Sequence, residues 1–122
     1  MRRFLSILSL LFICFSLGCA EKLNVNRPIA EVKAEAQEMS LAQLEKAALT
    51  YGKEIRGRYN KMEKVKYELK GLAPRDVLGA KGKEVKERYN KMSDEVKIFM
   101  EHYGVYARKY QELGGNTADI KY

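Results

Sequence analysis

Apolar residues along most of this chain recur at alternating spacings of three and four residues. One such stripe runs from Leu41 to Leu72, and a second runs without a break from Val85 to Leu113. This spacing gives a helix one apolar face, and over several heptads it is typical of helices that pack side by side. The alternation that marks a half-buried strand is missing. The pattern therefore predicts an all-α fold with two long helices.

Glycine and proline interrupt the pattern between the two stripes. Residues 71–82 hold three glycines together with Pro74, a composition that marks a turn. Pro74 can also begin the second helix early, with Val77 and Leu78 tucked into the turn. Because two helices joined by a short turn lie antiparallel, we expect a coiled-coil-like helical hairpin domain over residues 28–113.

An eleven-residue block occurs twice, once in each expected helix. It reads GKEIRGRYNKM at residues 52–62 and GKEVKERYNKM at residues 82–92, with eight identical positions. A repeat at this offset indicates one helical unit used twice. Its tyrosines and methionines lie on or beside the apolar stripe, which favours a role in packing. The repeated Arg, Asn and Lys are either a solvated face or a duplicated ligand motif.

The position of the turn predicts which residues face each other. A turn centred in this segment pairs Tyr59 with Met92 and sets Leu69 beside Gly82, where the small residue lets the two backbones approach. Tyrosine and methionine suit such a layer, because sulfur packs well on ring edges. The first stripe has one fault, at Arg58, and the neighbouring Tyr59 can cover the gap.

The amino terminus has the layout of a secretory signal peptide. Two arginines precede an apolar run that is too short to span a bilayer as a permanent helix. The run ends in SLGC, with the cysteine at position 19, and this ending resembles the lipobox of bacterial lipoproteins. The resemblance implies that residues 1–18 are removed as a signal peptide and that Cys19 carries a lipid. Ordinary secretion, with cleavage after Gly18 or Ala20, is the alternative.

Lipidation would also occupy the one thiol left in the mature chain. Cys14 leaves with the signal peptide, so Cys19 has no partner for an internal disulfide in an oxidising compartment. Several acyl chains, such as palmitate, would hold the protein firmly to a bilayer. The resemblance implies a protein of the bacterial cell envelope, and Ala20 in place of an aspartate favours the outer membrane where the host has two membranes.

Shorter segments flank the expected hairpin. Residues 19–27 have no helical period and are interpreted as a lipid-anchored tether, and residues 114–122 as a flexible tail. From Pro28 to Met39 the spacing predicts a short amphipathic helix, and Ser40 begins a capping-box pattern that starts the next helix. Because a lone two-helix hairpin buries little apolar surface, this short helix can fold back as a third helix, or two or more chains can associate along the stripe.

Positive charge is concentrated around the turn. Loss of residues 1–18 lowers the net charge from +7 to +5, and residues 52–91 alone carry thirteen Lys and Arg against six acids. In a hairpin this basic region lies far from both termini, so we expect it to bind an anionic envelope polymer, an anionic lipid or an acidic protein. Lysines that merely solvate a long helix are the alternative. The candidate residues are Lys53, Arg56, Arg58, Lys61, Lys83, Lys86, Arg88 and Lys91.

Residues with distinctive chemistry are sparse. His102 is the only histidine, so we interpret it as a residue of the surface or of the flank of its helix and expect no metal site. The sequence has no nucleophile elbow, no paired carboxylates in a cleft and no mature Cys–His couple, which argues against an enzyme, and no cofactor is expected. Phe99, Tyr103, Tyr106 and Tyr110 follow the stripe, so they are expected in the core rather than on a nucleic-acid surface.

Three functions agree with this pattern. The first is a membrane-anchored lipoprotein whose helical hairpin is a structural or adaptor element with a basic tip. The second is a protein-binding module or inhibitor at the cell surface or in the periplasm. The third is a carrier for a hydrophobic ligand, for which Ala47 and Ala48 beside tyrosines leave room. Lys121 is followed by Tyr122, which argues against covalent linkage to peptidoglycan through a carboxy-terminal lysine.

Overall fold

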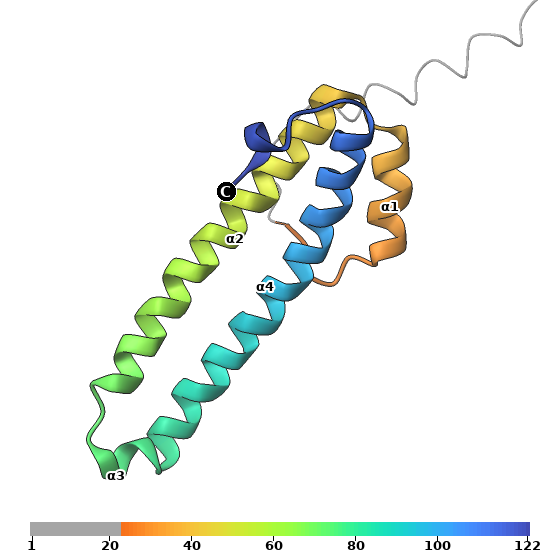
Figure 1. Cartoon of the computed structure of the whole chain (residues 1–122). Helices are drawn as coiled ribbons and strands as arrows, with labels where there is room; N and C mark the ends of the chain where they lie inside the picture. The colour runs from red at the N-terminus through yellow and green to blue at the C-terminus, as the bar shows by residue number, and fades with distance from the viewer. Residues whose placement is uncertain (1–22) are drawn as a thin grey trace, which may run out of the picture.

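The computed structural model describes residues 23–122, and every regular element in that part of the chain is helical. The expected signal peptide and the lipidation site Cys19 lie outside the described residues. Two long helices run antiparallel, and a shorter helix lies along one of them (Figure 1). The elements are α1 (Ile29–Glu38), α2 (Leu41–Lys70), α3 (Pro74–Val77), α4 (Ala80–Glu112) and the 3-10 helix η1 (Thr117–Ile120).

The long helices α2 and α4 confirm the antiparallel hairpin. Helix α2 begins after Ser40. The Ser40 hydroxyl accepts a hydrogen bond from the backbone N–H of Gln43 at 3.3 Å, and the Gln43 side-chain oxygen accepts one from the backbone N–H of Ser40 at 2.8 Å. This is the capping box that the sequence predicts, and it satisfies amides that the first turn of a helix leaves unpaired. The chain reverses within residues 71–79, and α3 lies at the centre of that turn.

Helix α1 packs along α4 as a third helix. Its apolar side buries Val32 and Ala36 completely. The short helix therefore folds back as a third helix within one chain, which is one of the two arrangements that the sequence allows. The segment leading into α1 also packs, because Leu23 and Val25 of the expected tether lie against the core.

The carboxy-terminal tail is packed rather than loose. After α4 the chain passes over the end of the hairpin and returns beside α2 (Figure 1). Ile120 is fully buried, and its carbonyl accepts the Tyr103 hydroxyl at 2.8 Å. The ring of Tyr122 meets the Tyr103 ring edge-on, with centroids 4.8 Å apart. The expectation of a flexible tail is therefore replaced by a segment that covers the hairpin.

The two ends of the hairpin differ in thickness. We call residues 52–91 the arm and the rest of the described chain the base. In the base, α1, the entry segment and the tail cover the two long helices. The arm is a two-helix extension, in which the buried apolar side chains are Ile55, Met62, Val65 and Val85. The base buries Val32, Ala36, Leu44, Ala48, Tyr51, Val96, Phe99, His102, Tyr106, Tyr110 and Ile120.

The two long helices face each other in a register that differs from the expected one. Tyr59 is 44% exposed and donates its hydroxyl to the sulfur of Met100 at 3.6 Å, so the predicted pairing of Tyr59 with Met92 is wrong. Glu68 of α2 pairs with Arg88 of α4, which is likewise farther along α4 than the expected register places its partner. The turn explains the shift, because α3 packs against the start of α4 and α4 therefore begins beyond the end of α2.

Both glycines that open the repeated block lie under another segment. At Gly52, an added Cβ atom would stand 2.9 Å from the Cβ of Tyr122. At Gly82, an added Cβ atom would overlap the carbonyl of Val77 in α3. The close backbone approach predicted at Gly82 is therefore present, but its partner is Val77 and not Leu69. Each copy of the block thus accommodates a covering segment at its first residue.

Candidate functional site

The structure separates charge along the hairpin. The arm carries thirteen Lys and Arg against six Asp and Glu, whereas residues 23–51 and 92–122 of the base together carry seven against nine. The last residue of the chain lies against Gly52 of α2, where the arm begins, and the arm extends from there to α3 (Figure 1). An excess of one sign at one end of a molecule attracts ligands of the opposite sign. The arm is therefore the candidate site, and anions are its candidate ligands.

Six of the eight candidate cations form an accessible set on the arm. All six are exposed, and none of them pairs with an acid among residues 23–122. They come from both long helices, so each helix of the arm presents cations that are free to bind an anion. The six residues are Lys53, Arg56, Lys61, Lys83, Lys86 and Lys91.

Arg58 belongs to the packing between the helices and not to this accessible set. Its side chain is 16% exposed, bonds to Glu54 at 2.8 Å and pairs with Glu95 of α4. Its guanidinium also lies 4.7 Å from the centre of the Phe99 ring. A long side chain with a cationic head can fill an apolar seam in this way. Arg58 itself therefore fills the fault in the apolar stripe, where Tyr59 was predicted to cover the gap.

Arg88 is exposed but already has a partner. Its guanidinium donates to the Glu68 carboxylate at 2.6 Å, and this hydrogen bond raises the pKa of Arg88. Exposed ion pairs stabilise a fold only slightly, because water screens both charges. An external anion can therefore compete with Glu68 for Arg88. It would bind there more weakly than at the six unpaired cations, because it must first displace Glu68.

A groove of about 330 Å³ lies between α2 and α4 in the arm. Its walls combine apolar and cationic groups: Val65, Lys66, Leu69, Val85, Lys86, Tyr89 and Asn90. The hypothesis of a hydrophobic-ligand carrier placed room farther back, at Ala47 and Ala48. There Ala48 is fully buried in the core, and Ala47 packs against it. An accessible groove with apolar walls between the long helices therefore lies in the arm.

The tip of the arm, residues 70–83, carries features that the hydrophobic pattern does not reveal. Leu78 was expected inside the turn, but it is 89% exposed. Val77 takes the inner position, with its carbonyl against Gly82. The short segment around α3 has one side toward α4 and one toward solvent. Hydropathy does not reveal whether Val77 or Leu78 lies on the inner side. Three further exposed cations lie here: Lys70, Arg75 and Lys81.

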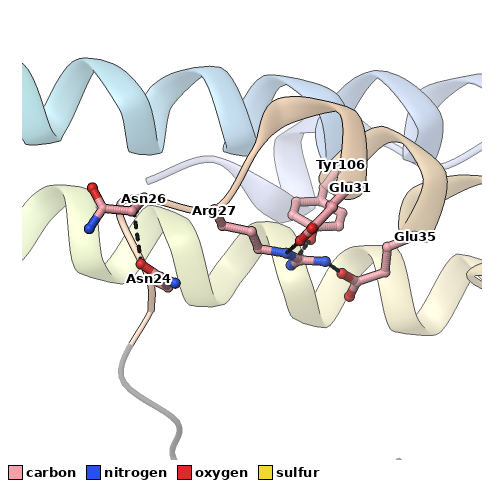
Figure 2. A network of polar contacts seen from close by, with 6 residues as sticks. All are labelled: Asn24, Asn26, Arg27, Glu31, Glu35 and Tyr106. Atoms are coloured by element: carbon pink, nitrogen blue, oxygen red, sulfur yellow. Dashed lines mark hydrogen bonds and ion pairs between the residues drawn. The ribbon is translucent and has the colours of Figure 1, made fainter.

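A polar network joins the entry segment to α1 and α4, and Figure 2 shows its members. Arg27 pairs with Glu35 and lies 3.9 Å from Glu31, both on α1. The same guanidinium donates to the Tyr106 hydroxyl of α4 at 3.1 Å. Burial raises the pKa of Tyr106, so this hydroxyl stays protonated and neutral near pH 7. The network fixes the described start of the chain to the base, which is a structural role.

His102 lies in the core of the base, which corrects its assignment to the surface. It is 1% exposed, and its ring lies 5.6 Å from that of Tyr51 and 6.4 Å from that of Phe99. Burial lowers the pKa of His102, and its Nδ1 atom has no hydrogen-bond partner among the described residues. The signal was present in the spacing, since His102 stands three residues after Phe99 and four before Tyr106. The described residues contain no group of three or more His, Cys, Asp or Glu placed to hold a metal ion.

Comparison with known proteins adds no family to these observations. The chain matches no protein-family model, and searches of curated proteins and of solved structures found no match to it. Within residues 23–122, no helix is both long and apolar enough to cross a bilayer. A functional proposal therefore depends on the residues and the geometry described above.

Proposed function

We propose that this protein is a lipid-anchored protein of the bacterial cell envelope whose arm binds anionic envelope components. In this proposal Cys19 carries the lipid, and the base is the end that faces the anchoring membrane. The hairpin is then a structural or adaptor element that connects this membrane to an anionic polymer, lipid or acidic protein. The observation that carries the proposal is the separation of charge along the hairpin, with six exposed cations on the arm that pair with no acid among residues 23–122.

The position of the anchor agrees with this polarity. Cys19 precedes the first described residue by four positions, and the described chain begins with residues that pack on the core of the base. Four residues span at most about 14 Å when fully extended. The lipid would therefore lie near the base, and the arm would extend from there.

The length of the hairpin makes the two ends electrostatically independent. Helix α4 has 33 residues, which corresponds to about 50 Å at the rise of an α-helix. Screening at physiological salt reduces interactions between exposed charges beyond roughly 8 Å. The cations at the tip of the arm, residues 70–83, therefore respond to their own surroundings and not to the slightly acidic base.

The test compares charge reversal on the arm with charge reversal on the base. The protein is the mature chain with Cys19→Ser, which keeps every described residue and cannot take a lipid. The arm variant carries Lys53→Glu, Lys61→Glu, Lys83→Glu and Lys91→Glu. We expect the parent to bind anionic vesicles or purified sacculi in low salt and to release them in high salt. The arm variant should bind at least about a hundredfold more weakly, because each cation near an anionic surface contributes about 1 kcal/mol.

The matched control carries Lys33→Glu, Lys46→Glu, Arg108→Glu and Lys121→Glu. These four residues are exposed cations of the base, so this variant has the same net charge as the arm variant. It should keep most of the binding, and circular dichroism should show both variants folded. Equal loss in the two variants, or no salt-sensitive binding by the parent, would refute the proposal.

A further inference from the structure

The arm ends in a bare leucine. Leu78 follows α3 and is 89% exposed, more than any other exposed large apolar residue of the described chain. The small or apolar residues Ala73, Pro74 and Ala80 around it are exposed as well. These residues belong to the turn around α3, which closes the hairpin at the end opposite α1 and the tail (Figure 1). The outermost part of the molecule is therefore an apolar point on a convex end.

Cations and an aromatic ring lie at the same end of the arm. Tyr67 is 67% exposed in the last turn of α2, and the Lys70 Nζ atom lies 5.5 Å from the centre of its ring. Tyrosine suits the boundary between lipid and water, because its ring is apolar and its hydroxyl is polar. The tip contains one acid, Asp76, and four exposed cations: Lys70, Arg75, Lys81 and Lys83.

We infer that the tip binds an anionic lipid bilayer, with Leu78 inserted among the acyl chains and the surrounding cations at the headgroups. This inference rests on the proposed function and names the anionic partner of the arm. An exposed leucine stabilises a complex only where the partner removes it from water. Each lysine or arginine near an anionic bilayer strengthens binding by roughly fivefold. The two contributions act at the same end of the molecule, because Leu78 and the four cations all lie within the tip of the arm, residues 70–83.

The other anionic partners use less of this surface. A hydrated anionic polymer would pair with the cations but would leave Leu78 and its apolar neighbours in water. A protein partner needs about 800 Å² of complementary surface on each side, and a convex turn with one protruding leucine offers little of it. A bilayer accepts a convex apolar point with a cationic surround, and it is the partner that contacts both groups.

The experiment places a single tryptophan at the tip. The chain contains no tryptophan, so Leu78→Trp in the mature Cys19→Ser chain gives one emission signal. The probes are phosphatidylcholine vesicles with and without phosphatidylglycerol, each prepared with and without brominated acyl chains. We expect a blue shift of the emission and quenching by brominated lipid with the anionic vesicles only. With the native tip, Leu78→Ser should weaken vesicle binding about tenfold, since a buried leucine side chain is lost.

A second exposed leucine provides the matched control. Leu49 is 42% exposed on α2 within the base, so Leu49→Trp should show neither the shift nor the quenching, and Leu49→Ser should bind like the parent. Salt-sensitive vesicle binding by the Leu78→Trp chain without any change in its tryptophan emission would overturn the inference and leave the proposed function standing. Retention by sacculi but not by anionic vesicles would do the same. Binding to neither target would overturn both.

Discussion

Gly82 determines how the turn packs against the second long helix. It is buried in the first turn of α4, and the carbonyl of Val77 lies where a side chain would begin. Glycine lowers helix stability, because it exposes the backbone and loses more conformational freedom on folding. At position 82 this cost is offset by the close approach of α3, which also sets the register of the hairpin. Gly57, in the other copy of the repeated block, has no atom within 4 Å of an added Cβ.

Alanine substitutions at these two glycines should have opposite effects. Gly82→Ala forces α3 away from α4, and we expect it to lower the free energy of unfolding by about 1–3 kcal/mol. Gly57→Ala adds helix propensity in open space and should raise the same free energy by about 1 kcal/mol. Urea denaturation followed by circular dichroism measures both. A stabilising Gly82→Ala would contradict the contact with Val77.

At the scale of the elements, α1, the entry segment and the tail convert one end of a hairpin into a three-layered base. Arg27 connects the entry segment to α1 through Glu35 and to α4 through Tyr106. His102 of α4 is buried next to these contacts, with Tyr51 of α2 on another side. The charged groups that act on it are the Arg27 cation, which opposes its protonation, and the Glu101 carboxylate, which favours it. Burial has the largest effect, so the neutral imidazole is the form that fits the base.

The stability of the base should therefore depend on pH through His102. Its pKa is lowered in the folded state from an ordinary value of about 6.5, so the unfolded chain binds this proton more readily. As the pH falls through about 6.5 toward the folded pKa, protonation of the unfolded state should lower the free energy of unfolding. His102→Gln, which does not titrate, should show a smaller decrease between pH 8 and pH 5 in urea denaturation. Identical pH dependence in the two proteins would contradict the buried neutral state.

The sequence predicts the elements better than their contacts. Spacings of three and four residues identify α2 and α4, because a helix with one apolar face must bury it. They also indicate that Phe99, Tyr106 and Tyr110 are core residues, and all three are buried. The Tyr59 partner was missed, because α3 adds a helical turn of chain that composition alone does not reveal. The tail contact through Ile120 was missed, because a buried face is predicted from a repeated spacing of apolar residues and a single apolar residue provides none.

The candidate site was predicted at the level of charge and not of geometry. Counting residues placed the excess of cations in the arm, and most of those side chains are exposed there. The count did not reveal that Arg58 is occupied by Glu95 and Phe99, because ion pairs across a seam depend on the register. It did not reveal the exposure of Leu78 either, because α3 can turn either Val77 or Leu78 toward α4.

At the scale of the whole molecule, the two ends of the hairpin differ in charge and in thickness. The base is thick and slightly acidic, and it holds both ends of the described chain. The arm is thin and strongly basic, and it ends in an apolar point. With a lipid at Cys19, the arm of such a molecule would bind its anionic target at a distance from the membrane that holds the lipid. The central claim is therefore that attachment and anion binding occur at opposite ends of one hairpin.

The most direct test is whether the lipidated protein bridges two surfaces. Neutral vesicles that carry the lipidated chain are mixed with anionic vesicles or with purified sacculi, and light scattering and co-sedimentation are measured. We predict clustering or capture in low salt, reversal in high salt, and loss of both with the four arm substitutions to glutamate or with Cys19→Ser. If the vesicles carrying the lipidated chain are captured by neither target, or if the arm substitutions leave capture unchanged, the hairpin does not work from opposite ends as described here.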